Sequence, residues 1–437
     1  MAGLGFVTVD NRITYENYGI STDENKCGML FDYGLRSDPF GGFQSIKDNF
    51  GNRQIALLTC LEDAEELGIN SNFLNGVPYY HISQFFDYIG HNADLYIMFA
   101  DCSQGFDAIQ DFQYGVDGKL FQLGVWTEKC LWTNDTDNNY QFTSLIKDLQ
   151  IEAEVLGGRV GMINEAVMPL SIVLCANTAM LENDASHNKR VRFRDLPNGI
   201  DLNCPKVSVV LGQNGTNEVH NMQLQNTGYC PVGFLGLAMA CLYLATAEIN
   251  IGEVRSFNLN KNNTINNAEL GFGSVSANIV INDYTPISEI IRSRANTISK
   301  NGYILPTTYN GKEAEVFFSN DQTMSDGDYS QISLNRIMNK CRRIIRGALL
   351  PYLNSTVYLS STGGLTDSMV AVLTNEIINK LDAIMVSKDQ GNPQILGRDV
   401  LIDTEQDILA NDGIEIEISI IPANTSEIIN ATETSGE

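Results

Sequence analysis

Short apolar runs that suit β-strands alternate with segments of helical periodicity between about residues 50 and 255. The strand-like runs include RQIALLTCL, ADLYIMFAD, GKLFQLGVWTE, MPLSIVLCAN and KVSVVLGQ, and helical patterns such as EDAEELGI and YQFTSLIKDLQIEAEVLG lie between them. Such alternation is typical of β-α-β units, in which helices cover a largely parallel sheet. The sequence therefore predicts an α/β domain. Residues 15–30 are polar and contain glycine, so we expect them to form a connection.

A second, smaller unit follows an Asn-rich stretch at 256–285. It holds two short strand-like runs (GYILPTTY and EAEVFFSN), a basic helix, a helix ending near residue 387, and two final strands. This mixture predicts an α+β unit. We accordingly expect an N-terminal strand arm with its linker at 1–20, an α/β domain at 21–285, an α+β domain at 286–421 and a C-terminal arm at 422–437.

The two final strands predict a hairpin at 395–421. The last strand alternates strictly, so one face carries its isoleucines while Glu415, Glu417 and Ser419 face outward. The residues expected on the apolar side of the hairpin are Val400, Ile402, Ile414, Ile416, Ile418 and Ile420.

Strand-like segments also occur at both ends of the chain. They are Phe6, Val7, Thr8 and Val9 near the start, and Ile428 and Ile429 in the tail. A single strand cannot satisfy its own backbone groups, so these segments either fray or add to sheet edges on other copies of the chain. The predicted hairpin offers such an edge.

No recognisable catalytic or cofactor-binding motif is present. The four histidines lack the spacing of a metal site, no G-x-S-x-G nucleophile elbow occurs, and YGVDGKLF lacks the frame of a phosphate-binding loop. We therefore predict no enzyme activity, no catalytic residue, no cofactor and no metal site. Any mechanical work must come from energy stored in the protein's own assembly or from a partner.

The cysteines and the longest apolar run predict a cytosolic protein without a membrane span. The nine cysteines form no C-x-x-C pair and several lie in apolar strings, which indicates reduced, buried thiols in a cytosolic compartment. The apolar run at 232–247 contains two glycines and follows Pro231, so it predicts a buried helix rather than a membrane span of about 20 residues. The first residues do not have the pattern of a secretory signal.

One helix departs from the acidic balance of the chain. The formal net charge is -25, yet five basic residues fall between 336 and 346, and no Asp or Glu occurs from 329 to 366. At 100° per residue, the apolar side chains fall within an arc of about 140° and the basic ones within an opposite arc of about 160°. The basic residues are Arg336, Lys340, Arg342, Arg343 and Arg346. We expect a capping box from Asp328 to Gln331 at its start, and an end at Pro351.

Three interpretations of this basic arc stay open. The side chains could pair with acids of the same chain, although exposed pairs contribute only about 0–1 kcal/mol each. They could dock on an acidic partner, where several desolvated arginine contacts would give specificity and register. Binding to nucleic acid is disfavoured, because the rest of this acidic molecule would repel phosphate.

Three stretches together resemble the sheath protein of contractile phage tails and related contractile injection systems. They are VGFLGLAMACLYLATAEINIGEVRSFNL, the stretch from NGYILPTTY through the basic helix to LLPYLNS, and the closing hairpin. The resemblance covers roughly residues 230–421 and rests on diffuse patterns rather than on an invariant signature. It is fainter in GVDGKLFQLGVWTE.

The resemblance implies a structural subunit. Sheath subunits form helical stacks of hexameric rings around an inner tube, and their contraction drives the tube through a target membrane. The α+β domain would lie inside and the α/β domain outside, with arms at about 4–13 and 424–432 that add strands to hairpins of neighbouring subunits. The basic residues at 336–346 would bind the inner tube.

The resemblance also implies partners and a location. Partners would be further copies of the chain, the inner tube protein, and baseplate and tail terminator proteins, with no nucleic acid and no direct membrane insertion. Assembly would take place in the bacterial cytoplasm, and the product would be a phage virion tail or a contractile injection particle. Two alternatives remain: a soluble α/β enzyme or ligand-binding protein with an unrecognised site, and another virion or injection-machine structural protein.

Overall fold

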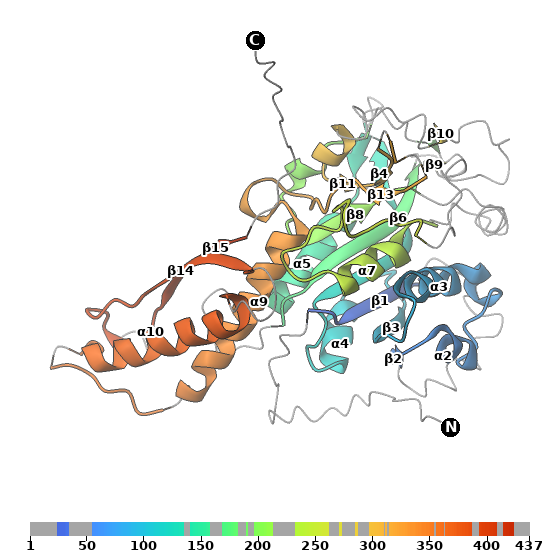
Figure 1. Ribbon diagram of the computed structural model, residues 1–437. Helices are drawn as coiled ribbons and strands as arrows, with labels where there is room; N and C mark the ends of the chain where they lie inside the picture. The colour runs from blue at the N-terminus through green and yellow to red at the C-terminus, as the bar shows by residue number, and fades with distance from the viewer. Residues whose placement is uncertain are drawn as a thin grey trace, which may run out of the picture.

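The computed structural model describes residues 24–34, 55–134, 140–157, 168–181, 189–190, 196–212, 232–261, 271–272, 285–286, 297–309, 311–312, 314–353, 355–361, 363–386, 393–408 and 414–423. Figure 1 shows two parts, which we call the α/β body and the C-terminal module. The body consists of a large sheet and the helices that cover it. The module consists of α10, β14 and β15 packed on one face of α9, and α9 (Ile332–Leu349) runs from the body into the module.

The body is built on a nine-stranded sheet with the order β11-β8-β6-β4-β1-β3-β2, to which β5 and β7 add at β4 and β6. Six strands run parallel to their neighbours, and four of them are buried at every residue, as expected for a sheet covered on both faces. The six parallel strands are β1 (Cys27–Asp32), β3 (Leu95–Ala100), β4 (Gln122–Asn134), β6 (Ser171–Leu181), β8 (Val207–Val210) and β11 (Tyr303–Ile304). The antiparallel additions are β2 (Ile55–Leu58), β5 (Tyr140–Phe142) and β7 (Lys189–Arg190).

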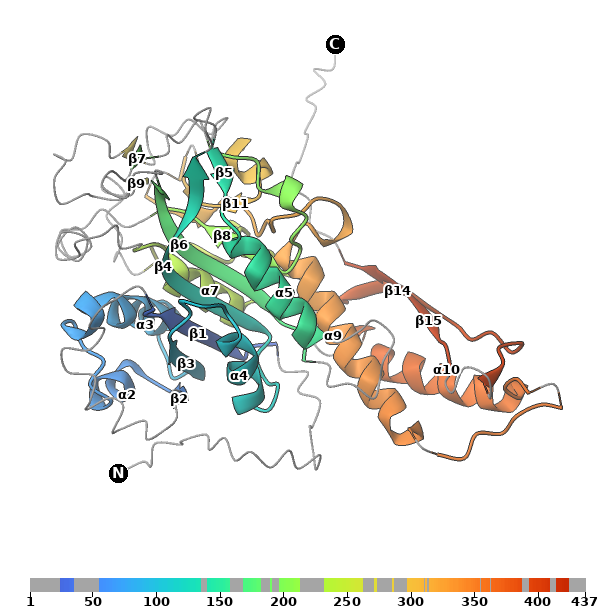
Figure 2. The same ribbon diagram turned by 180° about the vertical axis from the view of Figure 1, so that it is seen from behind.

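Helices cover both faces of this sheet (Figures 1 and 2). One face carries α7 (Leu235–Leu244), against which α3 (Val77–Ile89) packs, and the other carries α5 (Leu145–Gly157) together with α4 (Ala108–Gly115). A short helix, α2 (Leu61–Glu66), lies beside β2 and α3. The predicted alternation of strands and helices is therefore confirmed.

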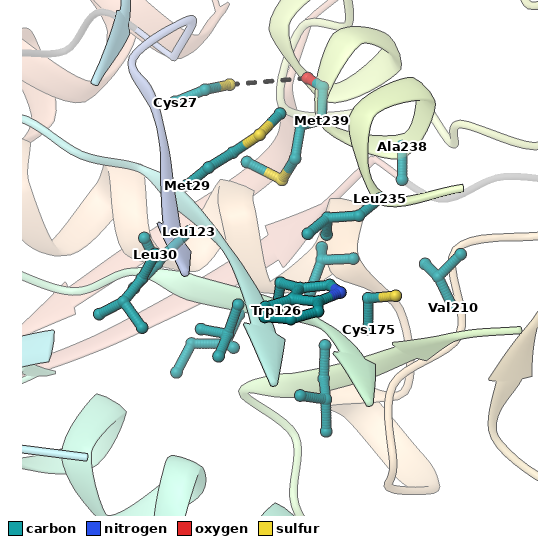
Figure 3. Close-up of a cluster of buried hydrophobic side chains, with 14 of the residues drawn as sticks. Cys27, Met29, Leu30, Leu123, Trp126, Cys175, Val210, Leu235, Ala238 and Met239 are labelled. Atoms are coloured by element: carbon teal, nitrogen blue, oxygen red, sulfur yellow. Dashed lines mark hydrogen bonds between the residues drawn. The ribbon is translucent and has the colours of Figure 1, made fainter. Parts of the chain in front are cut away.

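The apolar helix predicted at 232–247 is also confirmed. In α7 every side chain from 235 to 242 is buried. Figure 3 shows Leu235 of α7 next to Trp126 of β4, and Met239 of α7 next to Met29 of β1. The Cys27 thiol donates to the Met239 carbonyl at 3.7 Å. Gly236 allows α7 to approach α3, because a Cβ there would lie 2.2 Å from the His81 carbonyl oxygen.

The connection expected at residues 15–30 is wrong where the structure describes it. Cys27–Asp32 forms β1, a central strand paired with β3 and β4, and all six of its residues are buried. A glycine is needed here for close packing, since a Cβ at Gly28 would lie 2.9 Å from Leu120 Cδ1. The strand is short and its flanks are polar, so the stretch at 15–30 is polar on average even though its last residues form a strand.

A run that was expected to open the second domain belongs in part to the body sheet. The run GYILPTTY contributes β11 to the body sheet, and β12 (Pro306–Thr307) pairs with β13 (Phe317–Phe318) nearby. A further short pair joins β9 (Gly271–Phe272) and β10 (Thr285–Pro286). Ile332 belongs to the body's hydrophobic cluster and Ile337 to that of the module, so the change of core falls within α9. We therefore propose that the domain boundary lies later than the predicted residue 286.

The module holds a second, smaller hydrophobic cluster. It contains α10 (Asp367–Leu381), a π-helical turn at Asp382–Val386, and an antiparallel pair formed by β14 (Ile395–Leu401) and β15 (Glu417–Pro422). The predicted hairpin is therefore confirmed as a strand pair. The arm residues Phe6, Val7, Thr8, Val9, Ile428 and Ile429 lie outside the described residues.

Candidate functional site

The basic helix α9 begins differently from the sequence expectation. The predicted capping box at Asp328–Gln331 is wrong, because Asp328 lies in a separate 3-10 turn and the Gln331 side chain makes no capping hydrogen bond. The first turn is instead held by Asp321, whose carboxylate accepts a hydrogen bond from the Ser333 amide at 2.8 Å. Burial raises the pKa of Asp321 to about 6. As predicted, α9 ends before Pro351, which lies in a 3-10 turn at Leu350–Tyr352.

Both sides of α9 are covered. Its apolar arc, including Ile337, Cys341 and Ile344, packs against α10 in the module. Its basic arc faces the edge of the body sheet at which β1, β4, β6 and β8 begin, as the contacts described next show. This is the amino-terminal edge of the parallel strands, opposite to the edge at which open α/β sheets usually bind ligands.

Arg343 binds the backbone just before β4 and β6. Its guanidinium donates to the carbonyl oxygens of Gly118 at 2.6 Å, Leu120 at 2.8 Å and Pro169 at 3.0 Å. It also stacks on the ring of Phe121, with 4.4 Å between its Cζ atom and the ring centroid. Burial lowers the pKa of Arg343 to about 9, so the group is still charged at neutral pH. The side chain thus fastens α9 to two neighbouring strands.

Arg336 binds the end of α7. It donates to the carbonyl oxygens of Leu242 at 3.2 Å, Ala245 at 2.8 Å and Thr246 at 3.2 Å. The last carbonyls of a helix have no partner within the helix and carry partial negative charge, so a cation there is favourable. Burial lowers the pKa of Arg336, which the nearby carboxylate of Glu24 opposes. Arg336 therefore caps α7.

Lysines complete the contact between α9 and the body. Lys340 is paired with the carboxylate of Glu24, the residue three positions before β1. Lys206, at the start of β8, donates in the other direction to the Oδ1 atoms of Asn335 at 3.2 Å and Asn339 at 3.0 Å. Burial lowers the pKa of Lys206 to about 7.

These contacts give three of the five residues predicted to bind the tube acceptors within their own chain, and tube binding by the basic arc stays a prediction. Arg336, Lys340 and Arg343 are only 0%, 2% and 4% exposed, so they are not available to a partner in this structure. The physical reason is that backbone carbonyls and the Glu24 carboxylate of the same chain supply their acceptors. Arg342 and Arg346 are partly exposed, and a role for them in docking stays a prediction.

Sequence reasoning missed Glu24, Lys206 and Asp321 as partners of α9. One signal was available, because Asn335 and Asn339 lie one turn apart within the basic arc. Uncharged amides at those positions suit hydrogen bonding to a covering surface better than exposure.

The hairpin keeps the pattern predicted for it. Ile414, Ile416, Ile418 and Ile420 are half-buried against the module's cluster, while Glu415, Glu417 and Ser419 are exposed. On β14, Val400 is half-buried against the same cluster and Ile402, just after the strand, is buried. Among the described residues, no further strand pairs with β14 or β15. Apolar side chains also remain exposed on the hairpin: Leu396 at 67%, Leu401 at 61% and Ile421 at 60%.

The described residues show no grouping suited to metal chemistry. No set of three or more His, Cys, Asp or Glu that could hold a metal ion occurs among them. In the same part of the chain, no helix is long and apolar enough to cross a membrane. The eight described cysteines are free thiols. Burial raises the pKa of several of them, including Cys130 to about 11, which makes them poor nucleophiles.

Known structures share this fold over nearly the whole chain. A chain of the anti-feeding prophage (AFP) baseplate, 6-fold symmetrised, aligns with a TM-score of 0.52 and 11% identity, covering 95% of this chain and 94% of that chain. The chain has the fold of a contractile-particle protein. A chain of the AFP helical sheath in the contracted state aligns with a TM-score of 0.50 and 12% identity, covering 94% and 92%. A chain of the PVC sheath complex, from an extracellular contractile injection system in the contracted state, gives 0.50 and 10%, covering 94% and 91%.

Sequence comparisons reach less of the chain. Residues 328–432, from the turn before α9 onward, match the family described as "DUF2586, C-terminal domain". No curated protein matches the sequence. The predicted resemblance to sheath proteins is thus confirmed at the level of the fold.

Proposed function

We propose that this protein is a structural subunit of a contractile sheath, which polymerises around an inner tube and contracts to drive that tube through a target membrane. The observation that carries the proposal is the end-to-end fold likeness to sheath chains in the contracted state, which covers more than nine-tenths of both partners. A partial or one-domain match would support only a shared module. We propose accordingly that the chain acts as a structural element rather than as an enzyme.

The hairpin is the proposed receiving surface between subunits. A two-stranded sheet on its own is marginally stable in water, and this one buries its isoleucines only partly. Its strand edges pair with no further strand among the described residues, so they offer backbone donors and acceptors to a strand from another copy. We propose that the segments at 4–13 and 424–432 of other copies supply such strands. Support for the two segments comes from their sequence alone.

The inner tube protein remains a proposed partner, with a smaller basic contact than the sequence predicted. Of the five basic residues on α9, Arg342 and Arg346 retain partial exposure and can still meet an acidic surface. Changing both to Glu should weaken binding to the tube while leaving the fold intact. If this double variant still forms normal tube-bound sheaths, these two residues of α9 do not contribute to binding of the tube.

Negative-stain electron microscopy of the purified full chain tests the main proposal. Long tubes of stacked rings are expected, and deletion of residues 1–13 should yield soluble subunits or disconnected rings. Discrete small particles from the intact chain, alone and with the tube protein, would contradict the sheath role.

A baseplate component is a second candidate function, because one of the similar chains belongs to a six-fold symmetrised baseplate. The same microscopy separates the two, since a baseplate protein would give closed six-fold rings of fixed height rather than polymers of variable length. We further propose assembly in the bacterial cytoplasm and final residence in a phage tail or injection particle. Co-sedimentation of the protein with intact particles would test this location.

A further inference from the structure

Gln394 joins two segments that are far apart in the sequence, the one that precedes β1 and the one that follows β15. The Gln394 side chain donates from Nε2 to the Glu24 carboxylate at 2.9 Å, and the backbone carbonyl of Gln394 accepts from the Ala423 amide at 2.9 Å. Gln394 lies immediately before β14 and also donates its own amide to the Met385 carbonyl at 2.8 Å. The segments that continue beyond residues 24 and 423 therefore start from the same place on the subunit.

A buried lysine of α9 lies at the centre of this place. The Lys340 ammonium pairs with the Glu24 carboxylate and donates to Gln394 Oε1 at 2.7 Å. The Lys340 and Glu24 side chains are only 3% and 11% exposed. The second carboxylate oxygen of Glu24 accepts from the Ala247 amide just beyond α7, and Gln394 Nε2 also donates to Glu248 at 2.9 Å. We call Glu24, Lys340 and Gln394 the terminal junction.

We propose that the terminal junction fastens both terminal segments of the chain to α9, with Lys340 and Glu24 as the positioning residues. The proposal deepens the sheath function and rests on it for one consequence. If the terminal segments link subunits, tension on either one reaches the same helix, which is anchored through Arg336 and Arg343 at the amino-terminal edge of the body sheet. The contacts that the two terminal segments make with neighbouring subunits would then be coupled through α9.

The physical argument is that a buried ion pair cannot lose one partner cheaply. Removing the negative charge of Glu24 leaves the Lys340 ammonium buried with Oε1 of the Gln394 side chain as its described acceptor. Relief comes by moving Lys340 and Gln394 towards water, which pulls on the root of β14. A change at residue 24 should therefore loosen residues 394 and 423, although Glu24 and Gln394 are 370 positions apart in the sequence.

Hydrogen exchange on the unassembled full chain tests this coupling. In Glu24→Gln, the amides of Gln394 and Ala423 should exchange at least about tenfold faster than in the parent protein, while amides within β4 keep their rates. Gln keeps one oxygen for the Ala247 amide, while its NH2 group replaces the oxygen that accepts from Lys340 and Gln394. The substitution therefore removes both the charge and the shared acceptor of the junction, with little change in side-chain size. The matched control is Glu315→Gln, which breaks the more exposed Lys312–Glu315 pair and should leave all of these rates unchanged.

Lys340→Met supplies the reciprocal change. It should speed exchange at both Gln394 and the residues next to Glu24, and the double variant with Glu24→Gln should be less perturbed than the two single effects combined. If Lys340→Met does not fold, Glu24→Gln alone decides. Faster exchange confined to 24–34, with Gln394 and Ala423 unchanged, would overturn the proposal. This readout needs no polymer, so an absence of tubes from the parent protein would contradict the sheath function without touching the junction.

Discussion

The α/β body and the C-terminal module differ in how completely each one buries its own structure. The body encloses its parallel strands between helices, and all six residues of β1 and all six of β3 are buried. The module presents a two-stranded sheet whose isoleucines are half-buried and whose outer face exposes Leu396, Leu401 and Ile421. The central strands of the body are thus covered within one copy, whereas we propose that the hairpin of the module is covered by contact with other copies.

The same contrast explains the basic helix. An acidic chain that needs a charged docking face would place its arginines outward, yet three of the five basic side chains on α9 turn to the body. Arg336 and Arg343 donate to the buried carbonyls of Gly118, Leu120, Pro169, Leu242, Ala245 and Thr246, and Lys340 pairs with Glu24. The charge of α9 therefore stabilises the attachment of the module to the body. We place contacts between subunits mainly on the hairpin.

Arg343→Met should have the largest effect on the stability of the subunit. It removes the shared donor of three buried carbonyls and the stacking on Phe121, so we expect a loss of about 3–5 kcal/mol in the free energy of unfolding. Denaturant unfolding of the unassembled chain measures it. An effect below about 1 kcal/mol would mean that the basic arc does not anchor α9.

Lys206→Met tests the same contact through its pH dependence. The folded-state pKa of about 7 lies below the ordinary value of 10.5, so between these pH values the unfolded chain binds more protons than the folded chain. Lys206 thus makes the parent protein more stable as pH rises through this window, by up to ~1.4 kcal/mol per pH unit.

The stability of the parent minus that of Lys206→Met should accordingly increase from about pH 7.5 to 9.5, in unfolding curves measured at each pH. Below about pH 7 the difference should level off, because the lysine is then charged in both states. A difference that stays flat across the whole range would show that Lys206 is not held in a desolvated position.

Leu401→Lys combined with Ile421→Lys should change the stability of the subunit by less than about 0.5 kcal/mol, because both side chains are exposed. Polymer formation should nevertheless fall strongly, since charges would enter the proposed contact between copies. Sedimentation and negative-stain microscopy measure it. The matched control is Ile151→Lys on α5 of the body, where the side chain is 55% exposed. Equal loss of polymers in both variants would show that the hairpin contributes no more to polymer formation than the surface of the body.

Arg342→Ala should have only a small effect on the stability of the subunit. The side chain is a partly exposed neighbour of Arg343 on the same helix, and we expect a change within about 1 kcal/mol in unfolding experiments. A loss as large as that of Arg343→Met would show that the buried and the partly exposed arginines have the same role.

Much of the body and the hairpin could be predicted from the sequence, because apolar periodicity reports burial directly. The parallel sheet, the buried helix α7 and the alternation of Ile414, Ile416, Ile418 and Ile420 follow from it. The strand β1 was not predicted, because its six residues lie among polar neighbours and its position depends on pairing with strands far along the chain.

The partners of the basic arc could not be predicted for a related reason. A helical wheel separates charged from apolar side chains, but it does not show whether the charged side meets water or backbone carbonyls. The acceptors of Arg343 come from residues more than 170 positions earlier in the sequence. Only the folded chain brings them to the basic side of α9.

A cryo-microscopy reconstruction of the assembled protein tests the account most directly. It should show a helical polymer in which the edges or the exposed apolar face of β14 and β15 contact neighbouring copies. In the same map, Arg336, Lys340 and Arg343 should point into their own subunit. A polymer in which the hairpin faces solvent on all sides, with those three side chains turned to a tube, would contradict it.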